Sequence, residues 1–177
     1  MSPIPVIETE RMILRGWCGH DLDALADFFG DERNGAFIGG TKDRAQSWRQ
    51  LATFAGHWAL MGFGPFAMTL KDGGETIGYC GPWEPAGKHD EPEITYGLRS
   101  GYHRRGYMTE AARACVEYAF DHLKWPTVQS FVDKGNSASL GVVRKLGAKL
   151  DCETTLYGTV PVQIWRYPSL KSAEVTA

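Results

Sequence analysis

A loop between a predicted strand, which begins at Glu93, and a predicted helix gathers positively charged side chains. A helix N-terminus presents free amide groups and the positive end of the helix dipole, and nearby guanidinium groups add to its attraction for anions. Gly106 has no side chain, so the backbone can approach a phosphate closely there. The pattern predicts an anion site, although solvated arginines beside a turn glycine would produce it too. The side chains concerned are Arg99, His103, Arg104 and Arg105.

A second candidate element begins at Asp133, about thirty residues further along the chain. Asn136 is suited to cap a helix N-terminus, and Ser139 lies one turn later on the same side of that helix. An asparagine cap and a glycine stop at Gly147 also explain both helix ends without any ligand. By itself this element is therefore compatible with a purely structural role.

These two elements need a framework, and the spacing of apolar and turn residues predicts the order β-α-α-β-β-β-α-β-α-β-β. We expect a mixed α/β (α+β) fold with one twisted mixed sheet of about seven strands and helices on both faces. Residues 93–133 are expected to form a parallel βαβ unit. The expected strands are 11–17, 65–70, 75–81, 93–98, 128–132, 149–157 and 161–167, and the expected helices are 22–29, 42–60, 108–123 and 136–146.

The helical spacing of apolar residues also predicts which faces of the two longest helices are buried. For the helix over 42–60, the expected inner face consists of Ala45, Trp48, Ala52, Ala55 and Ala59. For the helix over 108–123, the expected inner face consists of Met108, Ala111, Ala112, Cys115, Ala119, Phe120 and Leu123.

The composition of the 177 residues, 43% hydrophobic and 23% charged, is that of a soluble globular protein. We predict one domain over residues 1–177, with a core over about 8–168 and a flexible tail over 169–177. The net charge of −2 argues against a general nucleic-acid binder. The sequence shows neither a membrane-spanning run nor a signal peptide, and its four cysteines form no CxxC pair. We therefore expect a cytoplasmic protein without a membrane partner.

Taken together, several segments resemble the GNAT N-acetyltransferase family, and within it the ribosomal-protein-alanine (Rim-type) branch. The run H103-R-R-G-Y-M occupies the place of the family signature Gln/Arg-x-x-Gly-x-Gly/Ala, which binds the pyrophosphate of CoA. The segment N136-x-x-S139, which ends in K145-L-G, resembles the helix beside the pantetheine arm. The runs T9-E-R-M-I-L-R15, I77-G-Y-C-G and E93-I-T-Y-G-L match the Rim-type branch. The likeness covers roughly residues 8–167.

The resemblance implies an acyltransferase that uses acetyl-CoA as co-substrate and acetylates a primary amine. Three positions depart from the family pattern. His103 stands where the family has Gln, Arg or Trp, Met108 where it has Gly or Ala, and Val143 where many members have a tyrosine as general acid. The implied CoA-binding residues are Leu98, His103, Arg104, Arg105, Gly106, Tyr107, Met108, Thr109, Asn136 and Ser139.

Acetyl transfer needs a neutral amine, whereas the pKa of an α-amine is near 8 and that of lysine about 10.4. A base or a proton-accepting water must therefore help. The resemblance makes Glu93 the candidate base, although a solvated charge at the strand end is the alternative. It also implies that the backbone N–H of Leu98 donates to the thioester oxygen and that Ser139 stabilises or protonates the leaving thiolate. His89 and His103 are not favoured as bases, and no histidine or cysteine spacing predicts a metal.

Acceptor recognition is expected from the less regular residues 30–42 and 82–92. The acidic residues there favour a cationic acceptor, although charged loops are usually only solvated. The candidates are a protein N-terminal α-amine, a lysine side chain, a polyamine or another small amine, bound by a monomer or a homodimer. The alternative from another class is a non-catalytic acyl-CoA-binding module. A different nucleotide-binding domain is disfavoured because neither GxGxxG nor GxxxxGK(S/T) occurs.

Overall fold

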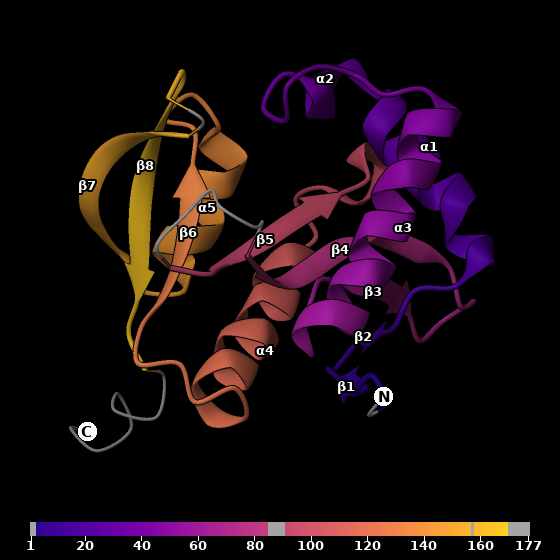
Figure 1. Ribbon diagram of the computed structural model, residues 1–177, viewed down its shortest axis with the longest axis horizontal. Helices are drawn as coiled ribbons and strands as arrows, with labels where there is room; N and C mark the ends of the chain where they lie inside the picture. The colour runs from indigo at the N-terminus through magenta and orange to yellow at the C-terminus, as the bar shows by residue number, and fades with distance from the viewer. Residues whose placement is uncertain (1–2, 85–90, 157, 170–177) are drawn as a thin grey trace.

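The computed structural model describes residues 3–84, 91–156 and 158–169, which form one mixed sheet with helices packed against it (Figure 1). The strands of this part are Ile7–Glu8 (β1), Met12–Arg15 (β2), Phe66–Leu70 (β3), Thr76–Trp83 (β4), Glu93–Leu98 (β5), Val128–Val132 (β6), Lys149–Leu156 (β7) and Val160–Tyr167 (β8). Their order in the sheet is β1-β2-β3-β4-β5-β6-β8-β7, and only β5 and β6 pair in parallel among these neighbours. The predicted mixed α/β fold is confirmed, with the short β1 added to the seven strands expected.

Helices lie on both faces of the sheet, as the sequence predicted (Figure 1). The α-helices of the described part are Leu22–Gly30 (α1), Glu32–Gly35 (α2), Arg44–Met61 (α3), Tyr107–Asp121 (α4) and Ser137–Lys145 (α5). The helix α1 packs with α3 on one face, around the buried Tyr79 of β4. The helix α4 packs on the other face against β2, β4, β5 and β6, and α5 lies beside it against β6. Across the described ranges, every helix falls short of the length or the apolar composition that a membrane span requires.

The helix α3 turns a different face toward the sheet from the one predicted. Its buried residues include Leu51, Phe54 and Trp58, whereas Trp48, which was expected inside, is 50% exposed. Burying these larger side chains removes far more apolar area from water than burying alanines, so this face of α3 packs against the sheet. His57 on the same face is accommodated because its ring nitrogens hydrogen-bond with backbone groups. The alanines predicted to face inward are exposed or only partly buried: Ala45, Ala52, Ala55 and Ala59.

The helix α4 buries most of its predicted stripe. Phe120 and Leu123 are only partly buried, and Leu123 lies beyond the end of the helix. The small side chains of the stripe let α4 lie close against the strands. This contact fixes the N-terminal end of α4 relative to β5. The residues that are buried as predicted are Met108, Ala111, Ala112, Cys115 and Ala119.

The strand β5 is fully paired on one side only. It pairs with β4 along its whole length, but with β6 it shares the single register pair Glu93 and Gln129. Where the two strands part, the Ser130 hydroxyl of β6 donates a hydrogen bond to the Ile94 carbonyl oxygen at 2.5 Å. Beyond that point β5 and β6 diverge (Figure 1). The backbone edge of β5 is therefore open toward α5.

Candidate active site

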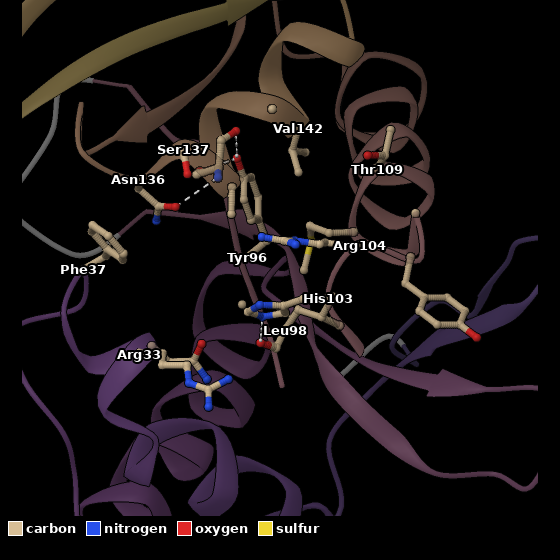
Figure 2. Close-up of a pocket in the computed structure, with 18 of the residues that line it drawn as sticks. Arg33, Phe37, Tyr96, Leu98, His103, Arg104, Thr109, Asn136, Ser137 and Val142 are labelled. Atoms are coloured by element: carbon tan, nitrogen blue, oxygen red, sulfur yellow. Dashed lines mark hydrogen bonds between the residues drawn. The ribbon is translucent and has the colours of Figure 1, made fainter. Parts of the chain in front are cut away.

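A cavity of about 500 Å³ opens where β5 leaves β6 (Figure 2). Its walls are β5, the loop and first turn of α4, the helix α5, and the segment that contains α2. The fold thus joins both elements that the sequence singled out. The predicted site residues that line the cavity are Leu98, His103, Arg104, Gly106, Tyr107, Met108, Thr109, Asn136 and Ser139.

Residues 103–109, called the anion loop below, carry a run of free backbone donors that begins at residue 104. Gly106 has a φ of 83°, a left-handed conformation that glycine adopts without strain. The first hydrogen bond of α4 runs from the Glu110 N–H to the Gly106 carbonyl oxygen at 3.1 Å. Among the described residues, no acceptor takes the N–H groups of residues 104–109. Such free donors at a helix N-terminus attract an anion, as the sequence predicted.

Arg11, just before β2, braces the anion loop from outside the cavity. Its backbone N–H and its Nε each donate to the Glu110 carboxylate, at 2.8 and 2.7 Å, and its Nη1 donates to the Arg105 carbonyl oxygen at 2.8 Å. The guanidinium group also lies over the Tyr107 ring, 4.4 Å from its centroid. Arg11 therefore holds the loop open while leaving its N–H groups free. The sequence contained this residue in the run T9–R15 but gave no sign of its contact.

The backbone of β5 directs a donor toward the open side of the strand. The Arg99 N–H donates to the Ile77 carbonyl oxygen of β4 at 2.9 Å. Hydrogen-bonded and non-hydrogen-bonded pairs alternate along antiparallel strands, so the Leu98 N–H points away from β4. The Leu98 carbonyl oxygen, on the same side, accepts a hydrogen bond from His103 Nε2 at 2.8 Å. His103 thus ties the end of β5 to the anion loop.

Two hydroxyl groups that contact each other line the cavity, one from α5 and one from β5. Asn136 caps the helix, because its side-chain oxygen accepts from the Ser139 N–H at 3.0 Å. The Ser139 hydroxyl lies 2.8 Å from the Tyr96 hydroxyl of β5. Burial raises the pKa of Tyr96, so its hydroxyl keeps its proton at neutral pH. The sequence analysis gave Tyr96 no role. Tyr96 lies two residues before Leu98, however, and residues at this spacing share one side of a strand, so the spacing could have indicated it.

The lining of the cavity is positively charged, in contrast to the negative net charge of the chain. Among the described residues that line it, Arg33, Arg104 and Lys145 are cationic and none is acidic. Lys145 lies one helical turn beyond Val142 and Gly141 on the same wall, a spacing that could have revealed it in the sequence. The cavity therefore suits a ligand with several negative charges.

Two of the predicted guanidinium groups are placed elsewhere. Arg99 binds Asp27 at 2.8 Å and Glu75 at 2.5 Å, and it does not line the cavity. The Arg105 guanidinium lies 5.6 Å from the centroid of the Tyr102 ring, also outside the lining. Of the four basic residues predicted at the anion site, the lining therefore includes only His103 and Arg104.

Glu93 also lies outside the cavity lining, at the closed end where β5 and β6 still pair. Its side chain is buried and accepts a hydrogen bond from the Phe131 N–H at 3.2 Å. Burial raises the pKa of Glu93 to about 7, against the effect of this hydrogen bond. At a rise of about 3.3 Å per residue, Glu93 lies roughly 16 Å along the strand from Leu98. Glu93 is therefore too far from Leu98 to contact a group that is bound there.

Of the two segments expected to recognise the acceptor, one lines the cavity and the other is only partly described. The first, residues 30–42, lines the cavity with Arg33, Asn34, Phe37 and Ile38, none of which is acidic. In the second, Trp83 stacks on a core histidine and Glu91 binds Arg166 at 2.7 Å, while residues 85–90, with His89 and Asp90, lie outside the described residues. The acidic lining expected for a cationic acceptor is thus absent from the described residues.

The geometry agrees with comparisons to known proteins. The family model described as "Acetyltransferase (GNAT) domain" matches residues 11–149. The chain belongs to the GNAT acetyltransferase family. This member is 30% identical over 151 residues to the protein YkkB of Bacillus subtilis (strain 168), a match that covers 78% of the chain and 82% of the relative.

Solved acetyltransferase structures share the fold. An acetyltransferase from Agrobacterium tumefaciens str. C58 has a TM-score of 0.84 and 30% identity, with 95% of this chain and 96% of that one covered. The aminoglycoside acetyltransferase AAC(6')-Ib in complex with coenzyme A has a TM-score of 0.74 and 21% identity, covering 92% and 97%. A putative ribosomal-protein-serine acetyltransferase from Vibrio cholerae has a TM-score of 0.77 and 16% identity, covering 95% and 100%. At these low identities, the last two structures show only that the fold is shared. The family model confirms the family, and the Rim-type branch stays a prediction.

Proposed function

We propose that this GNAT protein transfers an acetyl group from acetyl-CoA to a primary amine by direct attack of the amine on the thioester. The observation that carries the proposal is the open edge of β5, which directs the Leu98 N–H toward a cavity that also receives the free N–H groups of the anion loop. The acceptor is a small amine or a protein N-terminal α-amine.

The residues of the cavity fit acetyl-CoA. The free N–H groups of residues 104–109, with Arg104 and Lys145, suit a diphosphate, because they combine backbone donors with positive charge. The wall formed by Asn136 and Ser139 suits the pantetheine arm, which would then reach the open edge of β5. A neighbouring hollow of about 420 Å³ shares Gly106, Thr109 and Lys145 with the cavity and extends the same surface.

Each step of the transfer has a group of the chain to serve it. The Leu98 N–H donates to the thioester oxygen as negative charge develops there. As the amine nitrogen bonds to the thioester carbon and the C–S bond breaks, the Ser139 hydroxyl gives its proton to the sulfur. Tyr96 donates to the Ser139 oxygen at the same time, which leaves the serine proton free to face the sulfur and stabilises the charge left on the serine. The serine then regains a proton from solvent water, and the proton that the amine loses returns to solvent.

The amine loses its own proton to a base, and we keep Glu93 in this role, acting through water. Its pKa of about 7 suits a carboxyl that must accept a proton near neutral pH. Because Glu93 lies outside the cavity lining and roughly 16 Å along β5 from Leu98, the proton must pass through a chain of waters between the amine and the carboxylate.

The burial of Glu93 predicts a stability effect whose sign depends on pH. Because the pKa is raised from about 4.5 unfolded to about 7 folded, ionisation of Glu93 costs stability as the pH rises through this window, by about 3 kcal/mol in total. Glu93→Gln should therefore stabilise the protein relative to wild type at pH 8.5 more than at pH 5, as measured by urea unfolding. Glu117→Gln, an exposed glutamate on α4, is the matched control. A Glu93→Gln effect that is equal at both pH values would contradict the raised pKa.

The proposal is tested by separating binding from turnover. Calorimetry with acetyl-CoA measures binding, and release of free thiol with a panel of small amines and N-terminal peptides measures transfer. Binding with thiol release that depends on an amine is the expected result. Binding without release from any amine of the panel would favour the non-catalytic acyl-CoA-binding module, and absence of binding would refute both functions.

A further inference from the structure

The side of the cavity opposite the anion loop is formed by α2 and the residues that follow it. Figure 2 shows Arg33 and Phe37 on this side, across the cavity from Thr109, with Leu98 and His103 between them. Leu98 carries the N–H that the proposed function assigns to the thioester oxygen. The acceptor must therefore approach the thioester carbon from the side of Arg33 and Phe37.

Arg33 brings a positive charge to this side of the cavity. No ion pair or hydrogen bond with another described residue engages its guanidinium group. Asp31, two residues earlier in the sequence, accepts from the backbone N–H of Arg33 at 2.9 Å and from the Ser100 hydroxyl, and it interacts with the Arg33 charge only through space. By contrast, Arg44 binds a carboxylate at 2.6 Å and Arg99 binds one at 2.8 Å. The charge of Arg33 is therefore available to a ligand.

Apolar side chains flank this charge. Phe28 and Ile38 line the cavity, and Phe37 keeps 43% of its surface exposed. Phe28 reaches β5 because Gly97 has no side chain, and a Cβ at Gly97 would lie 2.5 Å from the tip of the Phe28 ring. An exposed aromatic side chain beside a cavity gains free energy when a ligand covers it. This side of the cavity thus combines one cation with an apolar wall.

We infer that the acceptor is a small amine that also carries a carboxylate group and an apolar body, an inference that rests on the proposed function. Arg33 binds the carboxylate, Phe37 and its apolar neighbours cover the body, and the amine is left facing the thioester. With Arg104 and Lys145 engaged by the diphosphate, the described lining still presents Arg33 and no carboxylate to the acceptor, so it repels a second ammonium group. Polyamines and aminoglycosides are disfavoured as acceptors for this reason.

Binding to the CoA-loaded protein tests the inference without depending on turnover. The probes are phenylalanine, 3-amino-4-phenylbutanoate and 4-amino-5-phenylpentanoate, each against its own primary amide, with spermidine as the polycation. Calorimetry should show at least one carboxylate binding about tenfold or more tightly than its amide. Equal affinities within all three pairs, or tighter binding of spermidine than of every carboxylate, would overturn the inference.

The N-terminus of a peptide with an acidic second residue offers the same chemistry. Two C-terminally amidated tetrapeptides, Phe-Glu-Ala-Ala and Phe-Gln-Ala-Ala, separate this source from a free amino acid. We expect the free carboxylates to show the larger preference over their uncharged partners. A preference confined to the peptide pair would overturn the assignment to a small amine.

Arg33→Glu should reverse the preference for the carboxylate probes, and Arg33→Met should remove it, each measured at a coenzyme A concentration that saturates the variant. Arg49→Glu, at an exposed position on α3, makes the same change of charge away from the cavity and should leave the preference intact. A preference that survives Arg33→Glu, or that Arg49→Glu also abolishes, would overturn the role of Arg33. Thiol release with the same probes is read separately, because its absence counts against the proposed function and leaves the binding result to decide the inference.

Discussion

Replacing Arg104 with glutamate and Gly106 with aspartate should abolish binding of acetyl-CoA while leaving the fold intact. The two changes put negative charge beside the free N–H groups of residues 104–109, where a diphosphate would otherwise accept hydrogen bonds. Losing even one or two charge-assisted contacts weakens affinity on the order of 100-fold, and the repulsion adds to this loss. Calorimetric titration with acetyl-CoA measures the effect, and circular dichroism checks the fold.

The aspartate also carries a conformational cost, which a control must separate from the charge effect. Gly106 has a φ of 83°, and a Cβ there would lie 3.3 Å from an Arg11 nitrogen. Gly73 has a similar φ of 77° in the turn between β3 and β4, with open space around it, so Gly73→Asp matches the strain and the charge away from the cavity. Arg49→Glu matches the other substitution. Normal affinity in the double variant, or an equal loss in the two controls, would refute the anion loop as the phosphate site.

The anion loop and α5 could be located from the sequence because their signals are local. A turn glycine before a helix, and an asparagine three residues before a serine, are each read from adjacent residues. The observed φ of Gly106 and the Asn136 cap agree with those local rules. Nothing local, however, indicated which side chains of the loop face the ligand. Arg105 turns toward Tyr102, whereas Arg104 lines the cavity.

The contacts that the sequence could not supply join residues far apart in the chain. Arg11 bridges to Glu110, and Tyr96 meets Ser139, only after the sheet and helices have packed. The divergence of β5 from β6 likewise depends on strand pairing, which no local pattern fixes. The family resemblance led us to expect Glu93 beside the acceptor, whereas the register places it at the closed end, where β5 and β6 still pair.

Removing the Ser139 hydroxyl should slow the chemical step on the order of 100-fold, the range for loss of a positioned proton donor. Ser139→Ala leaves the Asn136 cap intact, because that contact uses the backbone N–H of residue 139. Acetyl-CoA affinity should therefore change less than about twofold. Single-turnover measurement of acetyl transfer, under conditions where all the enzyme is loaded, isolates the step from binding and product release.

Tyr96→Phe tests whether the tyrosine acts through the serine. It removes the 2.8 Å contact between the two hydroxyl groups but keeps the ring, so the rate should fall less than in Ser139→Ala. If Tyr96 works only by orienting the serine hydroxyl, the double variant should be no slower than Ser139→Ala alone. Tyr118→Phe, on α4 away from the cavity, is the matched control. If the rate losses of the two single variants multiply in the double variant, the two hydroxyl groups act independently. A normal rate in Ser139→Ala would contradict the role of Ser139 and would mean that water protonates the departing sulfur.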